Sequence, residues 1–299
     1  MKKILITGTT GMLGSNLVDL FNANNKYEVF GLGRSLSPLL PKQNQIVADL
    51  ADLSGIGKYG IVPDVIIHSA ALTDLNLCER EPQLANKIHV DGSRAVAKLG
   101  GEKTKFIYIS TDSVFDGREG NYNENSRPNP VNVYASSKLG GEMAVKEVAR
   151  GEVTIIRTNI YGFHVPMKSS LAEWAFREWE FGRTISGFTD TIFNAVFTHQ
   201  LAVIIEQIIH RNAFYPTLNI GSSEAISKFD FLNRFRDILK VNNTLLTKAL
   251  STDFTSSIQR PRNTSLDTTL LSTFHTVPDF NEGLKDWISS NRSRNNRSL

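Results

Sequence analysis

The sequence predicts an α/β protein with a doubly wound parallel sheet and a smaller C-terminal lobe. Three observations support this fold class. Short apolar runs alternate with segments of helical periodicity through the first half of the chain, which is typical of βαβ units. The apolar runs are continuous, which indicates strands that are covered on both faces. After residue 162 the regular alternation ends and aromatic side chains become dense.

The expected elements follow one another in a regular order. Strands are predicted at residues 4–6, 27–32, 65–67, 106–109, 153–156 and 217–220. Helices are predicted after the glycine-rich residues 8–14 to about residue 23, over 82–99 and over 131–149. The late strand, 217–220, is expected to rejoin the sheet.

Composition excludes several classes of protein. Of the 299 residues, 40% are hydrophobic and 21% are charged, which excludes wholesale disorder. The net charge is only +3, and no dense basic stripe favours nucleic acid. The single cysteine, Cys78, excludes a disulfide within one chain. Since no apolar stretch reaches the ~18 residues of a membrane span, we expect a cytoplasmic protein without a nucleic-acid or membrane partner.

A glycine-rich segment joins the first predicted strand to the first predicted helix. Gly8, Gly11 and Gly14 have the spacing G-x-x-G-x-x-G. Glycines permit a tight turn and a close approach of the backbone to a pyrophosphate, while the helix N-terminus presents free N–H groups to the phosphates. A glycine-rich turn without a ligand is the alternative. The position between a strand and a helix favours dinucleotide binding.

Arg34 bears on the choice of dinucleotide. The residue after the second strand usually contacts the adenosine ribose, where an acid favours NAD and an arginine accommodates the 2′-phosphate of NADP. The sequence has Arg34 and no acid at this point. It therefore favours NADP(H) over NAD(H), with a solvated loop arginine as the alternative.

Thr111, Tyr134 and Lys138 form a candidate catalytic set. Tyr134 and Lys138 are four residues apart on a predicted helix, so they share one face. A neighbouring ammonium stabilises a phenolate and lowers its pKa, which suits a proton donor. Thr111 follows an apolar strand, where a hydroxyl faces the ligand crevice of a parallel sheet. The pair alone is common by chance, but its occurrence with the glycine loop and this hydroxyl is specific.

In combination these motifs resemble the extended short-chain dehydrogenases/reductases, and within them the dTDP-4-dehydrorhamnose reductase branch. The resemblance runs from Lys2 to about Ile288. Besides the glycine loop, the segments that carry it are Pro63–Ala71, Cys78–Pro82, Ser110–Asp112, Val114–Gly117, Pro130–Tyr134, Arg157–Gly162 and Arg260–Asp267.

The resemblance implies NADPH-dependent reduction of the C4 keto group of a nucleotide-activated 6-deoxysugar in polysaccharide biosynthesis. Tyr134 would protonate the developing alkoxide, and Thr111 would orient the carbonyl oxygen. Lys138 would lower the pKa of Tyr134 and hold the nicotinamide ribose. The implied cofactor contacts are Gly8, Thr10, Gly11, Met12, Leu13, Gly14, Arg34, Asp49, Leu50, Ala70, Ala71, Tyr134 and Lys138. The implied contacts with the nucleotide sugar are Thr111, Asp112, Asn159, Arg260 and Arg262.

The motifs also divide the chain. We expect residues 1–162, with about 188–222, to form an NAD(P)-binding Rossmann-type domain. About 163–187 and 223–288 would form the substrate-binding lobe, and 289–299 a flexible tail.

Arg260 and Arg262 are expected to contact the diphosphate, since a guanidinium matches phosphate oxygens. A solvated basic loop is the alternative for this pair.

The sequence departs from the branch pattern at several positions. His89 stands where the branch usually has asparagine, which puts the proton-relay role of that position in doubt, and Ser113 replaces an aromatic residue. Ser15-Asn16 stands where some bacterial members carry a carboxylate used with a metal, so no metal is expected. The dehydratases of the superfamily have a glutamate at the position of Ser113, and its absence argues against dehydration.

Other functions fit the same motifs. A ketoreductase could act on another UDP-, GDP- or dTDP-linked sugar, or on another small carbonyl compound. A non-catalytic NADP-binding regulatory subunit is a further alternative, because the β-subunit of methionine adenosyltransferase resembles the same branch. The intact Thr111, Tyr134 and Lys138 favour catalysis, although a fold does not by itself establish turnover. A homodimer is compatible with the superfamily.

Overall fold

The computed structural model describes residues 1–52, 60–164, 170–254 and 256–295. Within these residues, seven parallel strands form the central sheet in the order β11-β6-β5-β4-β1-β2-β3. The strands are β1 (Lys2–Thr7), β2 (Tyr27–Gly33), β3 (Gln45–Val47), β4 (Val65–His68), β5 (Lys105–Ile109), β6 (Val153–Thr158) and β11 (Thr217–Ile220). The predicted fold class is confirmed, and the late strand pairs with β6 as expected.

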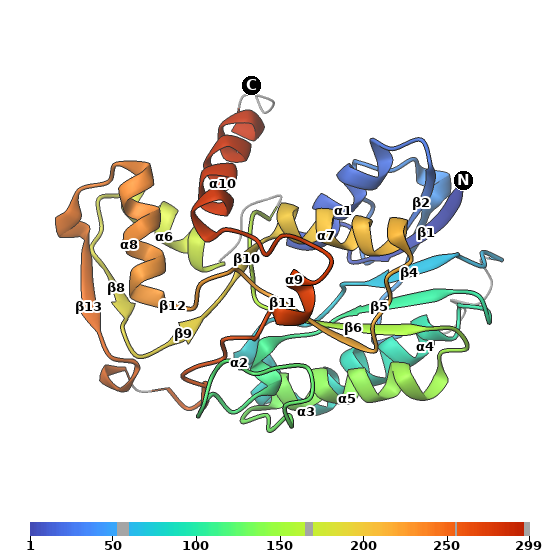
Figure 1. Cartoon of the computed structure of the whole chain (residues 1–299), viewed down its shortest axis with the longest axis horizontal. Helices are drawn as coiled ribbons and strands as arrows, with labels where there is room; N and C mark the ends of the chain where they lie inside the picture. Colours follow the sequence, from blue (N-terminus) through green and yellow to red (C-terminus); the bar gives the residue numbers. More distant parts are fainter. Residues whose placement is uncertain (53–59, 165–169, 255, 296–299) are drawn as a thin grey trace.

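Helices cover both faces of this sheet (Figure 1). One layer contains α1 (Met12–Asn22) and α7 (Thr198–Arg211), which pack against each other. The other contains α3 (Pro82–Asn86), α4 (Ser93–Ala97) and α5 (Val133–Val148), with α2 (Leu75–Arg80) beside α5. Parallel strands covered on both faces must be apolar on both, which explains the continuous apolar runs in the sequence.

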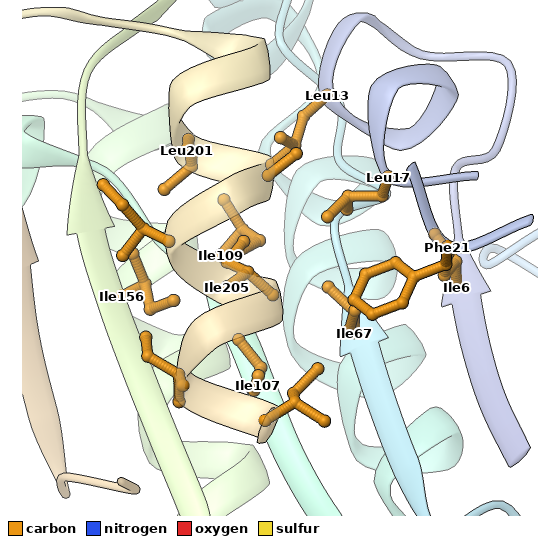
Figure 2. Close-up of a cluster of buried hydrophobic side chains, with 14 of the residues drawn as sticks. Ile6, Leu13, Leu17, Phe21, Ile67, Ile107, Ile109, Ile156, Leu201 and Ile205 are labelled. Atoms are coloured by element: carbon orange, nitrogen blue, oxygen red, sulfur yellow. The ribbon is translucent and has the colours of Figure 1, made fainter. Parts of the chain in front are cut away.

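Strand side chains alternate between the two layers. Ile4 and Ile6 of β1 belong to the cluster under α1 and α7, whereas Leu5 belongs to the cluster under α4 and α5. Figure 2 shows the first cluster, in which the helical side chains lie over the strand side chains. Its labelled residues are Ile6, Leu13, Leu17, Phe21, Ile67, Ile107, Ile109, Ile156, Leu201 and Ile205.

The helix predicted over 82–99 contains an irregular turn. Residues Lys87–Gly92 form a π-helical turn between α3 and α4. At its end the Ser93 hydroxyl donates a hydrogen bond to the carbonyl oxygen of His89 at 2.5 Å. Such turns are rare and occur preferentially at functional sites. The next helix, α5, begins where the Asn132 side chain caps the backbone N–H of Ala135 at 2.9 Å.

The smaller lobe, drawn at the left of Figure 1, combines short strands with three helices. The helices are α6 (Leu171–Glu180), α8 (Lys228–Leu239) and α10 (Phe280–Asn295). The strand pairs are β8 (Ile185–Phe188) with β13 (Leu246–Ala249), β9 (Ile192–Phe193) with β12 (Ile226–Ser227), and β7 (Ile160–Tyr161) with β10 (Val196–Phe197).

In the described parts of the whole chain, short 3-10 turns occur at Lys42–Asn44, Asp112–Val114, Asn243–Leu245 and Ser251–Asp253.

Aromatic side chains form the core of this lobe. Trp287 is fully buried, stacks on Phe163 at 4.0 Å between ring centres, and meets Phe235 edge-on at 4.8 Å. Trp179 is also buried, whereas Phe181 is exposed. Trp174 and Phe176 pack against the same cluster, so most of the aromatic residues in this segment belong to the core of the lobe.

The packing shifts some of the expected boundaries. Leu271, on the short helix α9 (Thr269–Ser272), packs with the cluster that covers the sheet, although its segment was assigned to the lobe. Phe193 packs with the lobe, although its segment was assigned to the sheet domain. The tail expected from residue 289 is helical up to Asn295, and residues 296–299 lie outside the described residues. No helix in the described ranges is long and apolar enough to cross a membrane.

Candidate active site

The carboxyl ends of the parallel strands meet at one edge of the sheet, which is where ligands bind in open α/β folds. Predicted cofactor, catalytic and substrate residues follow the carboxyl ends of six of these strands. They are Gly8 after β1, Arg34 after β2, Asp49 after β3, Ala70 after β4, Thr111 after β5 and Asn159 after β6. The topology thus brings together residues that are up to 151 positions apart in the sequence.

The glycine loop requires glycine for steric reasons. Gly8 has a φ of +73°, and a Cβ there would lie 3.0 Å from Cα of Ala70. A Cβ on Gly14 would lie 2.0 Å from the carbonyl oxygen of Gly8. Gly11 precedes α1, and neither a side-chain cap nor an acidic residue occupies its first turn. The loop therefore holds the helix against β1 and leaves N-terminal amides open, which fits the pyrophosphate of a dinucleotide.

The other predicted cofactor residues differ in exposure. Thr10 and Met12 are half-buried. Ala70 and Ala71, which follow the end of β4, are also half-buried. The Leu13 and Leu50 side chains pack into the two layers of the core, so only their backbones can face a ligand.

The loops after β2 and β3 also carry predicted cofactor residues. Arg34 is exposed. Asp49 accepts a hydrogen bond from the backbone N–H of Ala51 at 2.9 Å, which is a local loop contact.

Lys138 lies under the end of β5. Its ammonium donates a hydrogen bond to the carbonyl oxygen of Ile109 at 2.7 Å and lies 4.2 Å from the centre of the Tyr108 ring. Burial lowers the pKa of Lys138 to about 7, and Glu142 opposes that shift. Lys138 thus sits at the boundary between its charged and neutral forms near neutral pH.

The pKa of Tyr134 differs from the expectation. The pKa of Tyr134 is raised to about 12, mainly by burial and also by the charge of Asp112, while a hydrogen bond with Thr111 opposes these effects. The sequence predicted a lowered value through Lys138. The difference arises chiefly because burial disfavours the charged phenolate, while the Lys138 ammonium donates to the carbonyl oxygen of Ile109. In this state the phenol keeps its proton and lies beside the Thr111 hydroxyl.

Asp112 connects three segments of the chain. One carboxylate oxygen accepts hydrogen bonds from Asn159 at 2.9 Å and Thr264 at 2.5 Å. The other accepts from Thr111 at 3.2 Å and Ser113 at 3.3 Å. Asp112 is 1% exposed, and burial raises its pKa. Its predicted role as a substrate contact does not match this geometry, because both oxygens are engaged by the protein. Asn159 is likewise directed to Asp112.

Sequence reasoning missed a buried histidine network beneath the site. Burial lowers the pKa of His68 to about 3, so the ring is neutral. The Ser93 hydroxyl donates to the His89 carbonyl oxygen and therefore accepts from Nε2 of His68 at 2.9 Å. Nδ1 of His68 then accepts from the Thr7 hydroxyl at 2.7 Å. The network joins β1 and β4 to the π-helical turn.

His89 extends this network to the helix that carries Tyr134. Its Nε2 accepts from the backbone N–H of Leu72 at 2.9 Å, so Nδ1 carries the proton and donates to the Ser137 hydroxyl at 2.8 Å. Ser137 in turn donates to the backbone carbonyl oxygen of Tyr134 at 2.9 Å. The departure from asparagine at His89 was visible in the sequence, but its partners were not.

A buried ion pair supports the same helix. Arg157 on β6 donates to the Glu142 carboxylate through Nε at 3.1 Å and Nη2 at 2.8 Å. The Ser110 hydroxyl donates to the same carboxylate at 2.6 Å. Both charged side chains are almost fully buried. The pair joins α5 to the ends of β5 and β6, directly below Thr111 and Lys138.

Arg260 and Arg262 lie on the segment that joins the lobe to the sheet domain. Both are exposed. The backbone of this segment pairs with β9, since the N–H of Ile192 donates to the Arg262 carbonyl oxygen at 2.6 Å. Within the described ranges, neither guanidinium forms a hydrogen bond or an ion pair, so both can meet a ligand at this junction. The sequence missed a third cation here, Lys228, at the start of α8.

Comparisons with known proteins agree with this geometry. The family described as the RmlD substrate binding domain matches residues 1–293. The beta subunit of methionine adenosyltransferase 2 from Bos taurus is 30% identical over 281 residues, which is 91% of this chain and 82% of that protein. A probable low-salt glycan biosynthesis reductase, Agl14, from Haloferax volcanii is 26% identical over 270 residues, 88% of each protein.

Solved structures show the same similarity in three dimensions. The dTDP-4-dehydrorhamnose reductase from Bacillus anthracis, in complex with NADP, is 27% identical and superposes with a TM-score of 0.84, covering 97% of this chain and 99% of that chain. The enzyme of the same name from Yersinia enterocolitica is also 27% identical, with a TM-score of 0.82 and the same coverage. With its parallel sheet, glycine loop and Thr-Tyr-Lys set, the chain belongs to the RmlD substrate binding domain family of extended short-chain dehydrogenases/reductases.

Proposed function

We propose that the protein reduces the C4 keto group of a nucleotide-activated 6-deoxysugar, using NADPH. The observation that carries this proposal is the convergence of Thr111, Tyr134 and Lys138 at the end of β5, on the same edge of the sheet as the glycine loop after β1. NADPH, when bound, supplies the hydride that reaches the carbonyl carbon. The similarity to two dTDP-4-dehydrorhamnose reductases supports the substrate class.

The chain's own residues have three tasks in this reaction. Tyr134 is protonated at neutral pH, so its hydroxyl can give a proton to the carbonyl oxygen as negative charge develops there. Thr111 interacts with that phenol, and once its hydroxyl turns from Asp112 it can donate a hydrogen bond to the same carbonyl oxygen. Lys138, with a pKa of about 7, can stabilise the phenolate that remains once its ammonium turns from the Ile109 carbonyl oxygen.

The proposal is tested by following NADPH oxidation with a dTDP-4-keto-6-deoxysugar. Tyr134→Phe removes the proton donor and keeps the ring, so kcat should fall by on the order of 10²–10⁴. Tyr215→Phe, on a ring that stacks on Phe274 outside the site, is the matched control and should leave kcat unchanged. An active Tyr134→Phe variant would contradict the assigned role. Absence of turnover with dTDP-, UDP- and GDP-linked ketosugars would contradict the proposal itself.

A second candidate function is that of a regulatory subunit that binds NADP without turnover. It is favoured by the 30% identity to the beta subunit of methionine adenosyltransferase 2. The two candidates give different results in one pair of measurements. A regulatory subunit would bind NADPH, oxidise none with any of these ketosugars, and alter the kinetics of a methionine adenosyltransferase when the two are mixed.

A further inference from the structure

Lys228 is a cation that its surroundings do not neutralise. It is the first residue of α8, and its backbone N–H donates to the Thr191 carbonyl oxygen at 2.9 Å. The side chain is half-buried, and in the described part of the chain its ammonium forms neither a hydrogen bond nor an ion pair. A positive charge at a helix N-terminus also opposes the helix dipole. Burial and Arg260 both lower the pKa of Lys228.

The two carboxylates whose charges raise the pKa of Lys228 are already engaged by other donors. Asp112 accepts from four neutral donors. Asp190 accepts from the backbone N–H of Ser251 at 2.8 Å and from its hydroxyl at 2.6 Å. Both carboxylates attract the ammonium without pairing with it. The three N–H donors of Lys228 therefore remain open to a ligand.

Backbone pairing brings Lys228 and the two arginines to the same short strand. In the β9–β12 pair, Ile192 lies opposite Ser227, the residue before Lys228. On its other side Ile192 pairs with the segment that carries Arg260 and Arg262: its N–H donates to the Arg262 carbonyl oxygen, and its carbonyl oxygen accepts from Thr264 at 3.0 Å. The cations thus flank β9 at the junction between the lobe and the sheet.

This junction adjoins the candidate catalytic residues. The Thr264 hydroxyl donates to Asp112 at 2.5 Å, and Asp112 accepts from Thr111. A sugar carbonyl held by Thr111 would therefore place the first anionic group of the substrate near Lys228. In a nucleotide sugar, that group is the phosphate bonded to the sugar.

We propose that Lys228, with Arg260, binds the sugar-linked phosphate and thereby makes the site select nucleoside diphosphates over nucleoside monophosphates. The proposal rests on the proposed function, because it takes a nucleotide sugar as the substrate. An ammonium supplies a point charge and a guanidinium supplies a planar pair of donors, so together they match the oxygens of one phosphate. Arg262 extends the positive charge toward the second phosphate.

The proposal predicts opposite effects on binding and stability. Lys228→Met keeps the apolar stem of the side chain and removes an unneutralised charge, so the free protein should melt at the same or a higher temperature. Lys240→Met, at the C-terminal end of the same helix, is the matched control. A cation there favours the helix dipole, so its loss should lower the melting temperature slightly and leave ligand affinity unchanged.

The experiment is a calorimetric titration of the full-length protein with dTDP, UDP and dTMP. For dTDP we expect Lys228→Met to raise Kd on the order of 10- to 100-fold, as for the loss of a hydrogen bond to a charged group. Lys228→Arg should lose less, and dTMP should bind all variants with similar affinity. Lys228→Gln provides a second neutral variant if Lys228→Met folds poorly. The Kd for NADPH should not change in any variant.

Two outcomes would overturn the proposal: equal dTDP affinity in the wild type and Lys228→Met, or no binding of dTDP and UDP by the wild type. Failure of the reductase proposal is recognised separately. In that case no ketosugar oxidises NADPH, while Lys228-dependent binding of dTDP persists. Conversely, turnover with an unchanged KM in Lys228→Met would contradict the role of Lys228 and leave the reductase proposal intact.

Discussion

The floor of the site and the junction with the lobe use polar side chains in opposite ways. Beneath Thr111 and Tyr134, the buried polar side chains are engaged by protein partners, as in the Glu142–Arg157 pair and the His68–Ser93 hydrogen bond, and Nη1 of Arg157 is the exception among the described residues of this floor. At the junction, Lys228 has no pairing carboxylate among the residues that the structure describes. Satisfied buried networks hold catalytic groups in place, whereas open charges cost stability and serve a ligand. The comparison predicts that substitutions in the floor reduce stability, and that substitutions of the open cations reduce binding.

The buried ion pair should give the largest loss of stability. Glu142→Gln leaves the Arg157 guanidinium without its carboxylate in a site that water does not reach. We expect the free energy of unfolding to fall by about 3–5 kcal/mol, measured by urea denaturation. Glu147→Gln is the matched control, since Glu147 is on the same helix and pairs with Arg94 at the surface. A loss below about 1 kcal/mol in Glu142→Gln, as expected for a surface pair, would contradict the predicted difference between the buried Glu142–Arg157 pair and the surface pair.

The histidine network should give an intermediate effect. Ser93→Ala removes the acceptor of the His68 Nε2–H and the donor to the His89 carbonyl oxygen. The free energy of unfolding should fall by about 1–3 kcal/mol, because a buried donor loses its partner. Ser272→Ala is the control, since its hydroxyl contacts only the adjacent turn of an exposed helix, and it should change stability by less than about 0.5 kcal/mol. Equal effects of the two substitutions would show that the network contributes nothing.

The pH dependence of stability should report on Lys138. Its pKa is lowered from 10.5 to about 7 in the folded protein, so between these values the unfolded chain binds more protons. The free energy of unfolding therefore rises with pH from about 7 upward, as the folded state loses the cost of a buried charge. The raised pKa of Tyr134, about 12, reverses the trend above pH 10. Lys138→Met should flatten the rise between pH 7 and 10, and an unchanged slope would contradict the lowered pKa.

Arg34 should have the smallest effect on stability. Its side chain is exposed after β2, so Arg34→Ala should leave the melting temperature unchanged. If Arg34 binds the 2′-phosphate, the Kd for NADPH should rise on the order of 10- to 100-fold, and that for NADH should stay the same. Fluorescence titration measures both values. Lys42→Ala, another exposed cation beyond β2, is the control. Equal losses for NADPH and NADH would exclude a role in cofactor choice.

Local patterns were sufficient for much of the fold. Apolar runs predicted six of the seven strands of the central sheet. The glycine spacing predicted the loop between β1 and α1. These features depend on neighbouring residues, because strand burial and turn geometry impose residue types at short range. The boundaries of the lobe were less predictable. Leu271 and Phe193 are apolar in either assignment, and only packing decides which cluster they join.

The sequence by itself predicted residues that follow the strand ends at the candidate site, because the ends of parallel strands share one edge. Only the tertiary structure decided what each residue can do there. Asp112 is engaged by Thr264, 152 residues later, Lys138 donates to the Ile109 carbonyl oxygen, and burial raises the pKa of Tyr134. Lys228 becomes a candidate ligand-binding residue only because Asp112 and Asp190, whose charges attract it, accept hydrogen bonds from other residues. Burial and partner choice come from contacts distant in the chain, and these set the charge and hydrogen bonding of a side chain.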